Sequence, residues 1–249
     1  FYDAAAAVLD LAAAEAESGG FFPVYGVCLG FEALSIALGG GNASLLTPFD
    51  AEDTAAPLLF TPAARRSQLY GGMGGRALRT LEGRPYARES HAWGVSLESL
   101  VANKALAASV NVLSLSSDGT DGRVYVSSWE HRSLPVWATQ FHPEKNAWEW
   151  GDAWHIPHER GAVLALSQGF ANVLVDAARR AGPGHGPSLA EEAAGALDDF
   201  LIYNFPPAFT GRHDGPDTPF FDQAYVFKAW DDEGRVAAGG GRGAAAGAA

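Results

Sequence analysis

The spacing of apolar residues in this chain switches repeatedly between helical and strand-like patterns. Residues 2–17 are alanine-rich with a helical pattern that Gly19-Gly20 ends, and residues 29–38 form a second helical stretch that stops at three glycines. Residues 22–27, between them, are typical of a buried strand. Further strand-length runs occur at 45–47, 57–60, 109–115, 123–129 and 135–141, and further helical segments near 96–106 and 160–180. This alternation predicts an α/β fold with an open, mostly parallel sheet flanked by helices.

One turn modifies that picture. The stretch "SDGTDGR" (117–123) separates two β-rich runs and is rich in the residues that tight turns need. It predicts a hairpin, so we expect at least one pair of strands to be antiparallel.

The C-terminal part of the chain, from residue 181, has a different composition. "AGPGHGPS" (181–188) is a break in the pattern, and an acidic helix-like piece and the aromatic-rich "FLIYNFPPAFTG" follow it. Because aromatic side chains avoid water, we expect an extension from about residue 188 that packs back onto the domain. Residues 1–229 then form a single domain, and the Gly/Ala-rich residues 230–249 form a low-complexity, disordered tail.

Charge and composition exclude several classes of partner. The chain of 249 residues has 17 Lys and Arg against 29 Asp and Glu, which gives a formal net charge of −12. Its tightest basic cluster is Arg65-Arg66, so we expect no nucleic-acid partner and no binding to anionic membranes. The chain contains no run of 18 apolar residues, so the sequence does not predict a transmembrane helix. The chain begins at Phe1 inside a helical pattern, so we expect that a preceding segment, with any signal peptide, is missing.

The only cysteine lies between two glycines, at the point where a strand is predicted to give way to a helix. In Gly26-Val27-Cys28-Leu29-Gly30, we expect a turn too tight for side chains two residues on either side of Cys28. Such a turn would project the Cys28 side chain beyond the sheet edge, as in a nucleophile elbow. The helix N-terminus would favour the thiolate and lower the pKa of the thiol. The N–H of Leu29 would help to form an oxyanion hole. A buried cysteine that acts only as a small apolar residue is the alternative.

A base follows a later strand. The apolar run 135–141 leads into His142-Pro143-Glu144, and Pro143 favours an extended conformation at His142. Residues two apart in an extended chain face the same side, so Glu144 can orient the imidazole of His142 towards a thiol. Cys28, His142 and Glu144 are therefore the predicted nucleophile, base and orienting carboxylate.

With these stretches identified, the chain resembles the class I glutamine amidotransferase-like fold and, within it, the gamma-glutamyl hydrolase family. Both groups carry the glycine-flanked cysteine and the run Gln140-Phe141-His142-Pro143-Glu144. "CLGFE", "HPEKNAWEW", "SHAW" (90–93), "PLLFT" (57–61) and "IYNFPPAFTG…FFDQAYVF" are similar to the hydrolases. Amidotransferases usually have glutamine where Glu32 stands here. The resemblance covers about residues 1–229 and implies a flavodoxin-like three-layer arrangement whose first strands are missing from this chain.

The resemblance also implies an activity. Cys28 would attack the γ-carbonyl of a poly-γ-glutamyl folate and form a thioester, with His142 as the base. His91 would contact the substrate α-carboxylate and Glu32 the substrate amino group, unless they are an ordinary loop histidine and a solvated glutamate. The second half of the oxyanion hole would come from an upstream glycine-rich loop. The resemblance implies a small-molecule substrate, no cofactor, a possible homodimer, and a vacuolar, lysosomal or extracellular location.

Other interpretations stay open. A glutaminase domain that supplies ammonia, or a non-catalytic binding protein on the same fold, would share much of this pattern. "WHIPHER" (154–160) superficially suggests a metal site, but Pro157 interrupts any helix between its histidines, so we expect no metal and read it as a helix entry. Asn42-Ala43-Ser44 matches a glycosylation sequon. Lys145 is a candidate to offset substrate charge.

Overall fold

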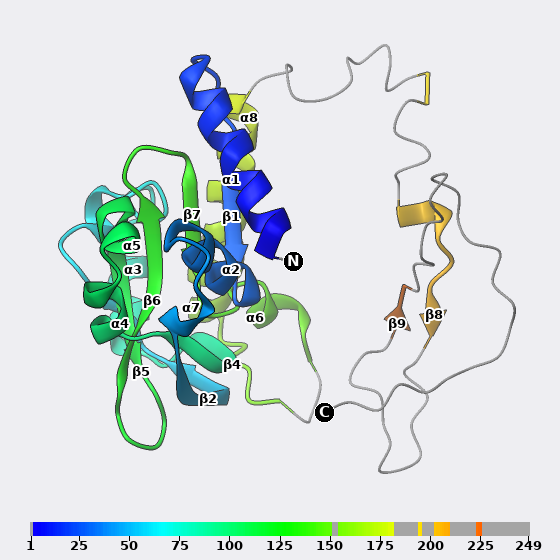
Figure 1. Cartoon of the computed structure of the whole chain (residues 1–249). Helices are drawn as coiled ribbons and strands as arrows, with labels where there is room; N and C mark the ends of the chain where they lie inside the picture. Colours follow the sequence, from blue (N-terminus) through cyan, green and yellow to red (C-terminus); the bar gives the residue numbers. More distant parts are fainter. Residues whose placement is uncertain (1, 151–153, 182–193, 196–201, 210–222, 226–249) are drawn as a thin grey trace, which may run out of the picture. The chain divides into compact units, whose positions relative to one another are not determined.

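The computed structural model describes residues 2–150, 154–181, 194–195, 202–209 and 223–225 (Figure 1). The chain divides into two compact units, Phe1–His185 and Gly186–Ala249. In the second unit, a 3-10 turn covers Ile202–Asn204, and β8 (Ala208–Phe209) pairs antiparallel with β9 (Gln223–Ala224). The packing of a C-terminal extension onto the domain stays a prediction, and the predicted tail 230–249 lies outside the described residues.

The first unit is built on a five-stranded sheet in the order β1-β7-β6-β5-β3. The strands are β1 (Val24–Val27), β7 (Val136–Thr139), β6 (Val124–His131), β5 (Val110–Ser117) and β3 (Leu59–Phe60). β1 runs parallel to β7, with Val24 opposite Val136 and Val27 opposite Thr139. Both strands therefore end at the same edge of the sheet.

Short connections determine the other pairings. β5–β6, β6–β7 and β3–β5 are antiparallel, and the predicted hairpin at 117–123 joins β5 to β6. Only residues 132–135 join β6 to β7, too few for the crossover that parallel strands need. Among the described strands of this sheet, the parallel pairing that the sequence predicts is found at β1–β7.

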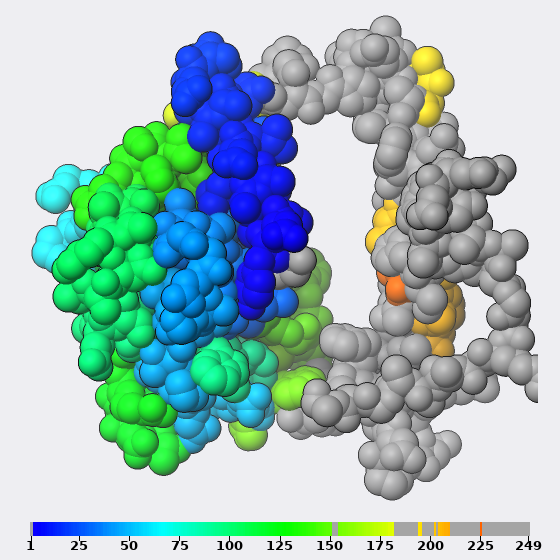
Figure 2. All heavy atoms as spheres, viewed as in Figure 1, coloured from blue at the N-terminus to red at the C-terminus, as the bar shows by residue number. Residues whose placement is uncertain are grey.

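Helices cover both faces of this sheet, because β7 is apolar on both sides. Val136 and Ala138 pack in a core with α1 (Tyr2–Glu17) and α2 (Leu29–Leu38). Trp137, which points to the opposite face, packs in a second core with α3 (Gly75–Gly83) and α8 (Gly169–Ala181). Figure 2 shows α1, dark blue, on the surface of the first unit beside α2. The predicted α/β class, with helices flanking a central sheet, is confirmed, as are the helices at 2–17 and 29–38.

Several elements were not predicted. β2 (Leu46–Ala56) and β4 (Ala87–Val95) form a separate antiparallel pair with two register shifts. The short helix α6 (Lys145–Trp148) and the 3-10 turns Ala43–Leu45 and Ala64–Arg66 were not predicted either. The predicted helical segment near 96–106 is found as α4 (Leu97–Ala102) and α5 (Lys104–Ser109), and α7 (Arg160–Val163) begins the predicted segment 160–180. β4 is the important omission, because it passes directly beside the candidate site.

The helical segment Arg160–Ala181, which consists of α7, a π-helical turn (Leu164–Gln168) and α8, is long and apolar enough to cross a membrane. However, Phe170 on this segment packs against three aromatic rings of the second core, those of Tyr25, Tyr70 and Phe141. These contacts are typical of a helix that covers a sheet.

Candidate active site

Cys28 lies at a sharp bend between β1 and α2. Its φ of 51° and ψ of −107° are outside the usual regions for a non-glycine residue, and α2 begins at the next residue. A side chain at Gly26 would collide with the backbone of Gly30 at 2.8 Å and with Leu34 at 2.6 Å. Strained backbone of this kind is common at functional sites. The predicted sharp turn at Cys28, between a strand and a helix, is therefore confirmed.

The second glycine of the elbow has a different explanation from the one expected. A Cβ atom at Gly30 would meet nothing within 4 Å. The expectation that the turn is too tight for a side chain on either side is therefore correct at Gly26 and wrong at Gly30. Gly30 already belongs to α2, and no atom lies close to the position that its Cβ would take.

His142 and Glu144 form a contact in the turn after β7. The Nδ1 atom of His142 lies 2.7 Å from the Oε1 atom of Glu144, and the imidazole is 17% exposed. Glu144 has helical backbone angles because α6 starts at the next residue, so a turn rather than an extended chain brings the two side chains together. The His142 ring holds the pKa of Glu144 below its usual range by a hydrogen bond and by charge, against the effect of burial.

Parallel pairing and β4 bring Cys28 and His142 to one region. The N–H of Cys28 donates to the Thr139 carbonyl (2.9 Å), and the N–H of His142 donates to the Arg88 carbonyl (2.8 Å). The thiol of Cys28 donates to the carbonyl of Ser90, with 3.8 Å from Sγ to O. β4 therefore contacts both residues, and the thiol contact within the described part of the chain is with β4 rather than with the imidazole.

The electrostatics at Cys28 differ from the expectation of a lowered pKa. Burial and the nearby Glu32 carboxylate raise the pKa of the thiol to about 11, although the N–H of Leu29 acts in the opposite direction. The helix N-terminus is present, but burial outweighs it. The resting thiol is therefore protonated at neutral pH and needs a base. The Leu29 N–H interacts with the sulfur, and its part in an oxyanion hole stays a prediction.

Glu32 is not a solvated first-turn glutamate. Its side chain is buried in α2, and its Oε1 accepts a hydrogen bond from the Nε2 atom of Gln140 at 3.1 Å. Burial raises the pKa of this carboxyl, while Gln140 and His91 lower it. From the sequence, Gln140 is identified only as part of the motif that contains His142. Its position two residues before the candidate base could have indicated that it belongs to the site.

His91 is not a loop histidine, because it belongs to β4 and is buried. Its Nε2 lies 3.0 Å from Glu89 Oε2, and its Nδ1 lies 2.8 Å from the Trp93 carbonyl oxygen. Both ring nitrogens are thus engaged within β4. Glu89 was not among the predicted site residues, because the run "RES" carries no strand pattern.

Lys145 is also engaged. Its ammonium group donates to both carboxylate oxygens of Glu149, at 2.7 and 2.8 Å. The Glu149 carboxylate therefore already neutralises the charge that Lys145 was expected to offer to the substrate.

The histidines of residues 154–160 have separate partners. His155 contacts Asp53 at 2.7 Å, whereas His158 contacts the Asn146 carbonyl and stacks on Trp150. Within the described residues no group of three or more potential metal ligands occurs. α7 begins at Arg160, directly after this segment, in keeping with a helix entry.

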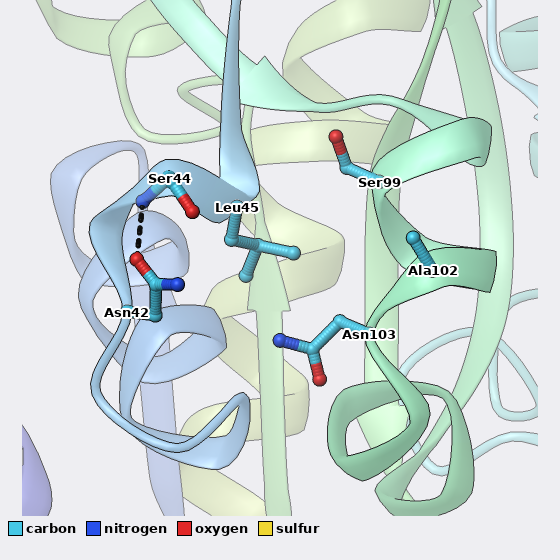
Figure 3. A pocket seen from close by; sticks show the side chains of 6 residues that line it. All are labelled: Asn42, Ser44, Leu45, Ser99, Ala102 and Asn103. Atoms are coloured by element: carbon cyan, nitrogen blue, oxygen red, sulfur yellow. Dashed lines mark hydrogen bonds between the residues drawn. The ribbon is translucent and has the colours of Figure 1, made fainter.

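Two cavities of the first unit are candidate binding sites. One of about 360 Å³ is lined by residues of β1, of α8 and of the turn containing Pro143 and Glu144, and therefore adjoins the candidate site. The other, of about 280 Å³, lies between the 3-10 turn after α2 and the α4–α5 segment (Figure 3). There Asn42 accepts a hydrogen bond from the N–H of Ser44, and Asn42 is exposed. This second cavity follows the C-terminal end of α2, whereas Cys28 precedes its N-terminus.

Comparison with known proteins points to a family. Residues 6–155 match the family described as glutamine amidotransferase class-I. Among curated proteins, the gamma-glutamyl hydrolase of Mus musculus is 36% identical over 211 residues, which is 85% of this chain and 62% of that protein. The gamma-glutamyl hydrolase of Homo sapiens is 34% identical over 85% of this chain and 61% of its own length.

A plant protein gives the same result. Gamma-glutamyl hydrolase 1 of Arabidopsis thaliana is 32% identical over 85% of this chain and 57% of its own length. The chain thus spans about three fifths of the length of the curated relatives it matches.

Proposed function

This chain belongs to the class I glutamine amidotransferase family, and from that membership we propose that it is a cysteine-type hydrolase of γ-glutamyl amide bonds. The substrates we propose are poly-γ-glutamyl folates, because the curated relatives reported above are gamma-glutamyl hydrolases. The observation that carries the proposal is the parallel pairing of β1 with β7. Because the two strands are parallel, β1, which precedes Cys28, and β7, which precedes His142, both end at the same edge of the sheet.

In the first half of the proposed reaction, Cys28 is the nucleophile. Its thiol is protonated at rest, so His142 takes the proton as the sulfur attacks the γ-carbonyl carbon. The new S–C bond gives a tetrahedral intermediate whose oxyanion accepts a hydrogen bond from the Leu29 N–H. The C–N bond then breaks, and the proton passes from His142 to the leaving amine. A γ-glutamyl thioester on Cys28 remains.

In the second half, His142 acts on water. It removes a proton as the water oxygen attacks the thioester carbonyl, and the S–C bond breaks to release the acyl part of the substrate with a free γ-carboxylate; for a folate substrate, this part carries the folate head group. The proton returns to the sulfur. Glu144 keeps one tautomer of the imidazole, because its carboxylate holds the Nδ1 hydrogen and leaves Nε2 free to accept.

Glu32 and His91 would act on the glutamate portion of the substrate. Glu32 is a buried carboxylate close enough to Cys28 to raise the pKa of the thiol. We assign it to the α-nitrogen of the substrate glutamate, which is an ammonium group at the first residue of a free γ-glutamyl peptide and an amide N–H in a poly-γ-glutamyl folate. We assign His91 to the substrate α-carboxylate, as the resemblance implies; both of its ring nitrogens are engaged within β4 in this structure. We propose no cofactor, a possible homodimer, and a vacuolar, lysosomal or extracellular location.

The family match favours a second candidate. A glutaminase that releases ammonia from glutamine would use the same cysteine and histidine, and the matched family is named for that chemistry. Glu32, at the position where amidotransferases usually carry glutamine, weighs against it.

A product assay separates the two candidates. The protein that contains this chain, at its natural length, is incubated with a γ-linked pentaglutamate and separately with glutamine. We expect shorter γ-glutamyl products from the first and no ammonia from the second. Cys28→Ala should abolish product formation, and Glu82→Gln, an exposed change on α3, should not. Ammonia from glutamine with an intact pentaglutamate would favour the glutaminase, and hydrolysis by Cys28→Ala would exclude the thiol mechanism.

A further inference from the structure

Glu89 and His91 form a buried pair on one face of β4. Their side chains are 0% and 1% exposed. Because residues two apart in a strand face the same side, the local strand geometry is enough to hold them together. The proposed mechanism assigns no role to Glu89, and yet its carboxylate is among the most deeply buried charges of the described residues.

The partners of His91 reveal where its hydrogens lie. Nδ1 faces the carbonyl oxygen of Trp93 at 2.8 Å, and a carbonyl can only accept, so Nδ1 carries a hydrogen. Nε2 faces Oε2 of Glu89 at 3.0 Å. Without a proton between them, a nitrogen lone pair would face a carboxylate in a buried site, which is strongly unfavourable. One further proton therefore lies between the two side chains.

We propose that Glu89 is a positioning residue that keeps the imidazole of His91 doubly protonated and fixed in place beside the candidate site. The carboxylate accepts from Nε2 and the Trp93 carbonyl accepts from Nδ1, so the ring is an imidazolium with neither nitrogen free. The imidazolium and the Glu89 carboxylate together carry no net charge, so His91 acts through its positive charge on groups that interact with the ring rather than with Glu89, as Glu32 does.

Four neighbours surround the pair. From β6, the ring of Tyr125 lies edge-on to His91, with 5.0 Å between ring centroids. The Tyr125 hydroxyl and the Oε1 atom of Glu89 are both buried without a hydrogen-bond partner among the described residues, and each suits the other as donor and acceptor. Burial and the Glu89 charge raise the pKa of Tyr125, so its hydroxyl keeps the hydrogen to donate.

The other neighbours are charged or nucleophilic. On β4 itself, Arg88 donates to the backbone carbonyl of Glu89, but its charge is paired with Asp53 at 2.8 Å. From α2, the carboxyl of Glu32 has its pKa lowered by His91, and Cys28 has its pKa raised in part by Glu89. The imidazolium therefore favours an ionised Glu32. This consequence rests on the proposed function, in which Glu32 binds the α-nitrogen of the substrate glutamate.

Glu89→Gln tests the proposal, because glutamine has nearly the same shape and can keep a hydrogen bond to the ring. Its amide N–H would donate to Nε2, so His91 would become a neutral ring with a hydrogen on Nδ1 only. The readout is the ¹⁵N NMR spectrum of the full chain labelled at histidine, with the His91 signals identified by their loss in His91→Gln. Glu82→Gln on α3 is the matched control.

We expect both ring nitrogens of His91 to be protonated at pH 7 in the natural chain and in the control. In Glu89→Gln, Nδ1 should stay protonated and Nε2 should not. An unprotonated nitrogen in the natural chain overturns the proposal without need of any variant. Two protonated nitrogens in a folded Glu89→Gln overturn it as well.

A kinetic measurement tests the link to Glu32. Loss of the imidazolium should raise the KM for a γ-glutamyl substrate about fivefold at pH 6 and less than about twofold at pH 8, with kcat within about twofold. An unchanged KM, together with the expected spectra, overturns the coupling to Glu32. If the natural protein does not cleave the γ-glutamyl substrate, the proposed function fails, and the spectra still decide the protonation of the pair.

Discussion

Two opposing influences act on the sulfur of Cys28. The start of α2 and the Leu29 N–H favour a thiolate, whereas burial and the Glu32 carboxylate favour the thiol, and the pKa of about 11 shows that the second pair is stronger. A thiol held in this way is inert until a base and a substrate are both present. At the scale of the residue, the site therefore depends on proton transfer rather than on a permanently ionised nucleophile.

The first prediction concerns the reactivity of this thiol without substrate. Because a raised pKa leaves the sulfur protonated below about pH 11, alkylation of Cys28 by iodoacetamide should be slow at pH 7 and rise about tenfold per pH unit towards pH 10. Mass spectrometry of the Cys28 peptide measures it. Glu32→Gln removes the largest neighbouring charge and should shift the curve to lower pH. A plateau near pH 7 in the natural chain would contradict the account.

The second prediction concerns the carboxylate beside His142. Glu144→Gln should lower kcat about 10²-fold with little change in KM, because the imidazole loses the carboxylate that fixes its tautomer. Glu149→Gln is the control, since it removes a neighbouring carboxylate that contacts Lys145 instead. Steady-state kinetics of both variants decide the matter. Equal effects would mean that local charge, rather than the contact to His142, is responsible.

At the scale of elements, the third prediction contrasts the two glycines of the elbow. Gly26→Ala should destabilise the fold by about 1–3 kcal/mol or more, because its Cβ would approach the Gly30 backbone to 2.8 Å. Gly30→Ala has open space and lies in α2, so its effect should be between zero and a gain of about 1 kcal/mol. Thermal or urea unfolding measures both. A large loss of stability in Gly30→Ala would contradict the elbow geometry.

Local patterns predicted the elements that are stable for local reasons. α1 and α2 end at glycines, and the 117–123 turn has the residues that a hairpin needs, so each is encoded within a short stretch. β2 was not predicted because it contains Pro48 and several acidic residues, which are uncommon in strands. β4 was missed because Arg88, Glu89 and His91 form a polar run. Arg88 is buried with a partner, Asp53, from another part of the sequence, whereas Glu89 and His91 are partners of each other within β4.

The candidate site divides in the same way. The elbow at Cys28 and the contact between His142 and Glu144 are short-range features, and the sequence predicted both. The network from Gln140 to Glu32 joins residues 108 positions apart, and it needs the parallel pairing of β1 with β7 to exist. The raised pKa of Cys28 was missed for the same reason, because it depends on burial by several elements.

At the scale of the whole molecule, net charge yields the fourth prediction. A protein of charge −12 repels a polyanionic γ-glutamyl chain, and Lys145 is already paired with Glu149. Added salt screens this repulsion, so kcat/KM should rise about twofold or more between 10 and 200 mM salt, and more steeply for longer chains. Kinetics with γ-linked di- and pentaglutamate measure this. A fall in kcat/KM with salt would indicate a positively charged capture surface instead.

The central claim is that the Cys28 sulfur becomes acylated during the reaction. Acid quenching of the natural-length protein within milliseconds of mixing with a γ-linked pentaglutamate, followed by peptide mass spectrometry, tests it directly. The account predicts a γ-glutamyl adduct on the Cys28 peptide that disappears as substrate is exhausted and accumulates less in His142→Gln. Substrate turnover with an unmodified Cys28 peptide, or an adduct on another residue, would contradict it.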